Sequence, residues 1–130
     1  MKFLTLEQAI EINNRLIKRY SPTEMVGVKD MGMLQSAIGR PQQSVFGNDA
    51  YPSIFDKATS LFESLAKNHP FQNGNKRTAF TCMVYFLHIN GQQFKMNQKQ
   101  AEDFTVDMVV GKYNFSEISD IIQECCTSIT

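Results

Sequence analysis

The segment "TAFTCMVYFLHI", Thr78 to Ile89, decides the fold, because it is one of the most apolar stretches of the chain. Apolar residues fall on almost every face of a helix drawn through it, and a helix that is hydrophobic all round lies in the middle of a domain. The run is far too short to cross a bilayer, which takes about 20 apolar residues. It therefore predicts a buried central helix that Gly91 ends.

The segments on both sides of this helix also carry apolar residues at helical spacing, and strict alternation is scarce. Each segment follows a polar residue that is suited to cap a helix N-terminus. These expected caps are Thr5 (with Gln8 in a capping box), Asp30, Ser53, Asn97 and Ser116. The sequence predicts an all-α fold, a single compact bundle of about six helices.

One stretch departs from the helical pattern, "QQSVFGNDAYPS" at residues 42–53. Its few β-prone residues are interrupted by glycine, an Asn-Asp pair and a proline. This composition predicts a short β-hairpin or an exposed flap loop.

Length and composition narrow the classes of function. The chain has 130 residues and no linker-like stretch, so residues 1–130 are expected to form one domain. Lys plus Arg and Asp plus Glu both number 13, which leaves no global field to draw the protein to DNA or to a membrane. An odd number of cysteines, a polar-interrupted N-terminus and no membrane span favour a reduced, cytoplasmic location.

The stretch before the central helix, "HPFQNGNKR" from His69 to Arg77, has the composition of an anion site. If the helix begins near Asn75, its first backbone N–H groups are free and the helix dipole adds partial positive charge there. Gly74 lets the backbone approach a ligand closely, and Asn75 can cap the helix or donate its amide. The turn therefore predicts bound phosphate.

Lys76 and Arg77 strengthen this prediction. First helical turns favour acidic residues, so two cations there oppose the dipole, and a bound anion explains them better than a solvated pair. Arg77 can hold phosphate through two parallel hydrogen bonds. The pattern points to a polyphosphate ligand, although neither the P-loop nor the dinucleotide fingerprint is present.

His69 and Phe71 complete the motif. A histidine beside bound phosphate can take a proton from an attacking hydroxyl, but a lone histidine at a helix end is more often a cap or a surface residue. Phe71 is expected to anchor the turn in the core. His88, with no paired ligand residue at metal-binding spacing, is expected to be a surface or hydrogen-bonded histidine.

The motif "HPFQNGNKR" resembles the Fic/Doc signature, which is H-x-F-x-[D/E]-G-N-G-R in Fic enzymes and H-x-F-x-D-x-N-K-R in the Doc (death on curing) branch. The likeness extends through "LQSAIGRPQQSVFGNDAYPS", "FDKATSLFESLAKN" and "FLHINGQQF". It implies a compact all-helical fold, a nucleoside triphosphate bound at the motif, and a toxin of a type II toxin–antitoxin module.

The resemblance implies a role for each motif residue. His69 is the general base, Phe71 the buried anchor, Gly74 and Asn75 the anion hole, and Lys76 and Arg77 the phosphate ligands. Lysine at position 76 is associated with transfer of the γ-phosphoryl group of ATP, whereas glycine there accompanies AMP transfer. The flap is expected to align a target peptide by adding a strand to it.

Asn73 departs from the family pattern, in which an Asp or Glu at this position binds Mg²⁺. A neutral amide offers one oxygen to Mg²⁺ but no charge. Three readings follow: a kinase that acts on a protein hydroxyl and arrests translation, with elongation factor Tu as the suspected target; an AMP transferase; or a silent antitoxin-binding module. A cognate antitoxin is the expected partner, with DNA contacted only through it.

Overall fold

The computed structural model describes residues 1–129 and confirms the all-α prediction. Within these residues the helices are α1 Leu6–Tyr20, α2 Met31–Gly39, α3 Ile54–Asn68, α4 Asn75–Ile89, α5 Gln98–Val109 and α6 Phe115–Glu124. A short 3₁₀ helix, Arg40–Gln42, follows α2. The strands are β1 Ser44–Val45, β2 Asn48–Asp49, β3 Gln92–Phe94 and β4 Cys126–Ser128.

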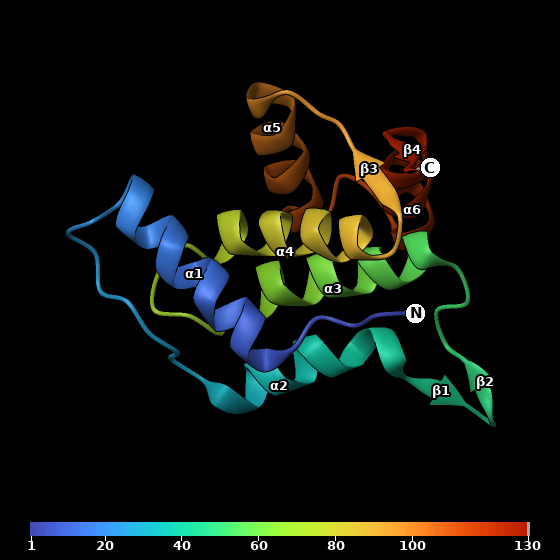
Figure 1. Ribbon diagram of the computed structural model, residues 1–130, viewed down its shortest axis with the longest axis horizontal. Coiled ribbons are helices and arrows are strands. Elements are labelled where there is room, and N and C mark those ends of the chain that lie inside the picture. Colours follow the sequence, from blue (N-terminus) through green and yellow to red (C-terminus); the bar gives the residue numbers. More distant parts are fainter. Residues whose placement is uncertain (130) are drawn as a thin grey trace.

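Helices α3 and α4 run antiparallel, side by side, through the middle of the molecule (Figure 1). Helix α1 packs against α4, and α2 and α6 pack against α3. Helix α5 lies above this central pair in Figure 1 and contacts both of its members. The loop that joins α3 to α4, residues 69–74, therefore sits at one end of the molecule, beside the end of α1.

The core lies between α3 and α4, as the apolar central segment predicts. Phe62 of α3 is fully buried, stacks on Phe104 with ring centroids 5.5 Å apart, and meets Phe80 edge-on at 6.2 Å. Helix α4 is less uniformly buried than expected, because Phe80 and its neighbours on that face are only half-buried and His88 is exposed. No helix within residues 1–129 is long and apolar enough to span a membrane.

The predicted caps are confirmed for four helices. Thr5, Asp30, Ser53 and Asn97 each accept a hydrogen bond from a backbone N–H in the first turn. The last helix is different: it begins at Phe115, and its cap is Asn114, not Ser116. Asn114 is favoured because Glu117 lies three residues on and closes a capping box.

A second sheet, which the sequence analysis missed, pairs β3 with β4 antiparallel. Gln92 pairs with Ser128 and Phe94 with Cys126, and the Ile129 N–H donates to the Gly91 carbonyl at 2.8 Å. Both strands are too short to show alternation. The sheet ties the chain after α6 to the end of α4.

The predicted hairpin is present as β1 and β2, with Ser44 paired to Asp49. It is fixed to the first turn of α3 by the buried Lys57, whose Nζ contacts Asp49 at 3.1 Å and donates to the Tyr51 carbonyl. The loop after α3 lies at the other end of this helix, roughly 22 Å away at 1.5 Å per residue (Figure 1). This placement gives no support to a flap that aligns a peptide at His69.

Candidate functional site

The chain reverses between α3 and α4 through two residues with left-handed backbone. His69 ends α3 with φ 49° and ψ 54°, and Gly74 begins α4 with φ 72° and ψ 22°. Histidine is among the non-glycine residues that tolerate this region best. The reversal places the exposed His69 beside the start of α4.

Gly74 is favoured by the space beside it as well as by its φ. A Cβ built on Gly74 would lie 2.9 Å from Ile17 Cδ1 and 3.4 Å from Asn13 Nδ2, both on α1. Close approach to a ligand is the reason that the sequence suggests for this glycine. The structure adds tight packing against α1 as a second reason.

Phe71 and Asn75 fix the shape of the loop. Phe71 is 1% exposed and belongs to the hydrophobic core, which confirms the expected anchor. Asn75 Oδ1 accepts from the Phe71 N–H at 2.9 Å, and its Nδ2 donates to the Phe71 carbonyl at 3.0 Å. Both side-chain groups of Asn75 are used to close the loop, so the expectation that its side chain caps α4 or donates its amide to a ligand is wrong.

The N-terminus of α4 is the one among the α-helices of residues 1–129 that has no side-chain cap. Its first backbone bond runs from the Thr78 N–H to the Gly74 carbonyl at 2.9 Å. The N–H groups before Thr78 have no acceptor within the helix, and the dipole places partial positive charge on them. An anion would satisfy these donors.

This helix end opens into a cleft of about 750 Å³. The cleft has the size of small-molecule sites in proteins. The predicted site residues His69, Asn73, Gly74, Asn75, Lys76 and Arg77 all line it. The structure therefore brings together every predicted site residue except Phe71, which lies beneath them in the core.

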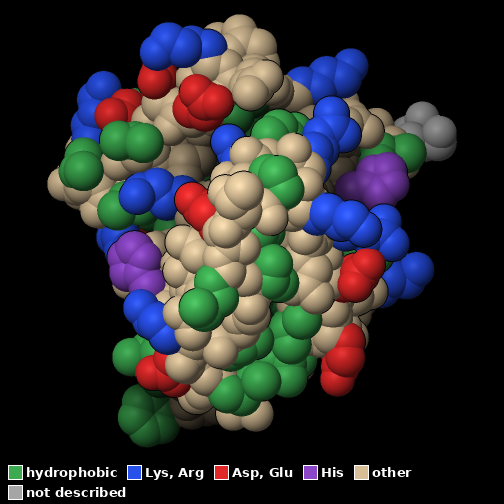
Figure 2. Space-filling view, turned by 90° about the vertical axis from the view of Figure 1, so that its left-hand side faces the viewer, with side chains coloured by type: hydrophobic (Ala, Val, Ile, Leu, Met, Phe, Trp, Pro, Cys, Tyr) green, Lys and Arg blue, Asp and Glu red, His purple; other side chains and the backbone are tan. Residues whose placement is uncertain are grey.

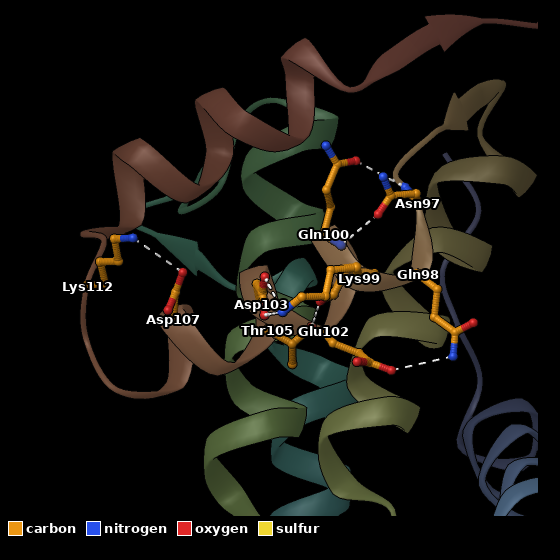
Figure 3. Close-up of polar contacts among 10 residues, drawn as sticks. Asn97, Gln98, Lys99, Gln100, Glu102, Asp103, Thr105, Asp107 and Lys112 are labelled. Atoms are coloured by element: carbon orange, nitrogen blue, oxygen red, sulfur yellow. Dashed lines mark hydrogen bonds and ion pairs between the residues drawn. The ribbon is translucent and has the colours of Figure 1, made fainter.

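Helix α5 forms the opposite wall of the cleft, a contribution that the sequence analysis did not predict. Gln98, Glu102 and Val106 follow at four-residue spacing and face the cleft, and Gln98 Nε2 donates to Glu102 Oε1 at 3.4 Å (Figure 3). Next to them, Lys99 Nζ forms an ion pair with Asp103 Oδ1 at 3.1 Å (Figure 3). This wall offers one amide, one carboxylate and an apolar surface.

Tyr20, at the end of α1, places Arg77. The Arg77 guanidinium lies over the Tyr20 ring, 4.2 Å from its centroid. This cation–π contact holds the guanidinium at the edge of the cleft, where its N–H groups are suited to bind a phosphate. Figure 2, which views this end of the molecule, shows basic and acidic side chains dispersed among apolar and other side chains. The positive charge at the site is local, as the balanced composition predicts.

Asn13 is a further site residue that the sequence analysis missed. It is 1% exposed on α1, and its Nδ2 donates to the Asn73 carbonyl at 2.9 Å and to Thr78 Oγ1 at 3.0 Å. The sequence does contain a sign of this role, because the polar Asn13 interrupts the apolar face of the helix between Ala9 and Ile17. Asn13 joins α1 to both ends of the turn that starts α4.

The residues of the cleft do not form a metal centre by themselves. Residues 1–129 contain no group of three or more His, Cys, Asp or Glu side chains that could hold a metal ion. Asn73 donates through Nδ2 to the Met25 carbonyl at 2.9 Å, so its Oδ1 is the single side-chain atom left for a cation. This neutral oxygen at the start of α4 fits Mg²⁺ poorly, because Mg²⁺ favours carboxylates, and the carboxylate that lines the cleft, Glu102, lies on α5.

Residues 3–87 match the Fic/DOC family, and the chain belongs to that family. It is 51% identical over 80 residues to "Toxin Doc" of Mycolicibacterium smegmatis, a match that covers 62% of this chain and 57% of that protein. It is 28% identical over 123 residues to "Protein kinase doc" of Escherichia phage P1, with 95% of this chain and 94% of that protein covered.

Proposed function

We propose that this protein is a Doc-type toxin that transfers a phosphoryl group from a nucleoside triphosphate such as ATP to a hydroxyl group of another protein. The observation that carries the proposal is the uncapped start of α4, flanked by Lys76 and Arg77, which opens with His69 into one cleft. The similarity to a protein named as a kinase supports the choice of phosphoryl transfer.

In this proposal the phosphates bind at α4 and the nucleoside binds against α5. The backbone N–H groups, Lys76 and Arg77 offer charge and directed donors, which phosphate oxygens accept strongly. Across the cleft Gln98 and Glu102 offer hydrogen-bonding groups for a base or a sugar, and Val106 offers apolar surface. A nucleotide uses both walls, whereas inorganic phosphate uses one.

His69 acts as the general base in this proposal. Its imidazole accepts the proton of the target hydroxyl as that oxygen forms a bond to the γ-phosphorus. The bond between the γ-phosphorus and the bridging oxygen breaks, and ADP leaves. Lys76 and Arg77 stabilise the charge on the phosphate oxygens, a contribution that is usually large in phosphoryl transfer.

Mg²⁺ accompanies nucleoside triphosphates, and here the protein contributes little to holding it. Asn73 can supply one oxygen, so the ion would be bound chiefly by phosphates and water. Neither the proton transfer to His69 nor the role of Lys76 and Arg77 depends on this ion.

Elongation factor Tu is the proposed target, with arrest of translation as the outcome, and a cognate antitoxin is the proposed partner. The similarity to a protein named as a toxin supports the toxin and antitoxin parts of this proposal. DNA contact would arise only through the antitoxin.

Two labelled substrates test the reaction. Elongation factor Tu is incubated with the protein and with ATP labelled at either the γ- or the α-phosphate. We expect label from the γ-phosphate in the target and none after the change His69→Ala. Label from the α-phosphate instead would identify AMP transfer, in which pyrophosphate leaves, and would overturn the kinase proposal.

A silent antitoxin-binding module is the second candidate, and Asn73 is the observation that favours it. This candidate predicts that expression of the protein without its antitoxin does not arrest growth. Growth arrest that His69→Ala abolishes would exclude it.

A further inference from the structure

We infer that Asn73 is a positioning residue, which ties residues 21–30 to the loop before α4 through its side-chain amide. These residues, called here the bracing segment, connect α1 to α2. The inference concerns the shape of the free protein and does not depend on which group is transferred.

The bracing segment pairs with the loop along its backbone. The Lys29 and Asp30 N–H groups donate to the Pro70 carbonyl at 2.8 and 3.0 Å, and the Gln72 N–H donates to the Gly27 carbonyl at 2.9 Å. Val28 and Phe71 form an antiparallel bridge. The bracing segment therefore acts as a short strand beside the loop that carries His69.

Asn73 extends this pairing by one contact. Its Nδ2 donates to the Met25 carbonyl at 2.9 Å, where the backbone pairing has ended. Met25 is 66% exposed and Val26 is 47% exposed, so apolar burial does little to hold this part of the bracing segment. The side-chain hydrogen bond is what fixes it to the loop.

The backbone of Asn73 is held from the opposite side. Its carbonyl accepts from Asn13 Nδ2 at 2.9 Å, and Asn13 is buried in α1. Asn73 is thus bonded both to α1 and to the bracing segment. The position of Gly74 and the start of α4 depends on these two bonds.

An aspartate at position 73 has nearly the same shape but cannot make the tether. A carboxylate has only acceptor atoms, so it would face the Met25 carbonyl oxygen at hydrogen-bonding distance without a proton between them. The bracing segment would have to move away. In this conformation the side chain at position 73 can supply either the tether or a charge for a cation, which accounts for the poor fit of this position to Mg²⁺.

Amide hydrogen exchange on the free protein tests the tether. The variants are Asn73→Asp, which keeps the shape and removes the donor, and Asn73→Ala, which removes both. Asn48→Asp, an exposed change in the hairpin at the other end of α3, introduces the same charge as a control. Exchange is followed at the Lys29, Asp30 and Gln72 amides.

We expect both changes at Asn73 to lower protection of these amides about two- to tenfold, the net worth of one hydrogen bond. The control Asn48→Asp should leave them unchanged, and Asn73→Gln, which keeps the amide donor, should retain part of the protection. Wild-type protection in Asn73→Asp would overturn the inference. A failure of the proposed transfer reaction would leave the exchange result untouched, so the two claims are tested separately.

Discussion

The change Gly74→Ala tests how the loop is packed against α1. The left-handed backbone conformation is less favourable for alanine by roughly 1–2 kcal/mol. Its Cβ would also lie 2.9 Å from Ile17 Cδ1, and overpacking of this kind costs about 1–3 kcal/mol. The smaller entropy of the unfolded alanine chain offsets about 0.4–1 kcal/mol. We expect a net loss of about 1–5 kcal/mol in the free energy of unfolding.

A second change separates the cost of the clash with Ile17 from the cost of the left-handed backbone. Ile17→Val removes the atom that the new Cβ would strike and by itself costs about 0.5–1.5 kcal/mol, since Ile17 is buried. If the clash is real, the double variant is more stable than the sum of the single effects predicts, by about 1 kcal/mol or more. The remaining loss then reports the left-handed backbone alone.

Urea unfolding followed by far-ultraviolet circular dichroism measures these energies. The midpoints should shift while the dependence on urea stays constant, which shows that stability rather than the unfolded state has changed. Additive effects, within about 0.5 kcal/mol, would refute the packing argument, because residues that do not touch behave in that way.

Three further predictions follow from single contacts. Asn13→Ala leaves the Asn73 carbonyl without its buried donor and should lower the unfolding free energy by about 1–3 kcal/mol in urea titrations; an unchanged midpoint would show that the bond is dispensable. Tyr20→Leu removes the ring that orients Arg77 and should weaken ATP binding about two- to fivefold in calorimetry, with no effect as the contradicting result. Burial raises the pKa of the Cys82 thiol from 9.0 to about 12, so the folded state keeps a proton that the unfolded state loses. Stability should therefore fall as pH rises from 9 toward 12, by up to about 1.4 kcal/mol per pH unit, and Cys82→Ala should make this fall shallower.

Local chemistry explains what the sequence predicts well. Thr5, Asp30, Ser53 and Asn97 cap helices because each bond reaches only three residues along the chain. The central helix is predictable because nothing but burial accommodates so apolar a segment. The motif stands out because its cations oppose the dipole of the helix that they begin.

Contacts between distant segments explain what the sequence analysis missed. Strands β3 and β4 are short and separated by α5 and α6, so neither shows a pattern of its own. The bond from Asn73 to Met25 joins residues 48 positions apart, and no propensity predicts it. The wall formed by α5 was hidden for a related reason, since its apolar stripe indicates the core and its polar face looks like ordinary surface.

Calorimetric titration with ATP and with adenosine, at low ionic strength, tests the central claim that the start of α4 binds a polyphosphate. Each charged hydrogen bond contributes about 1.5–3 kcal/mol, so ATP should bind at least tenfold more tightly than adenosine. Lys76→Ala and Arg77→Ala should each remove much of that difference and leave adenosine binding unchanged. Equal affinity for ATP and adenosine, or variants that bind ATP as the wild type does, would contradict the claim.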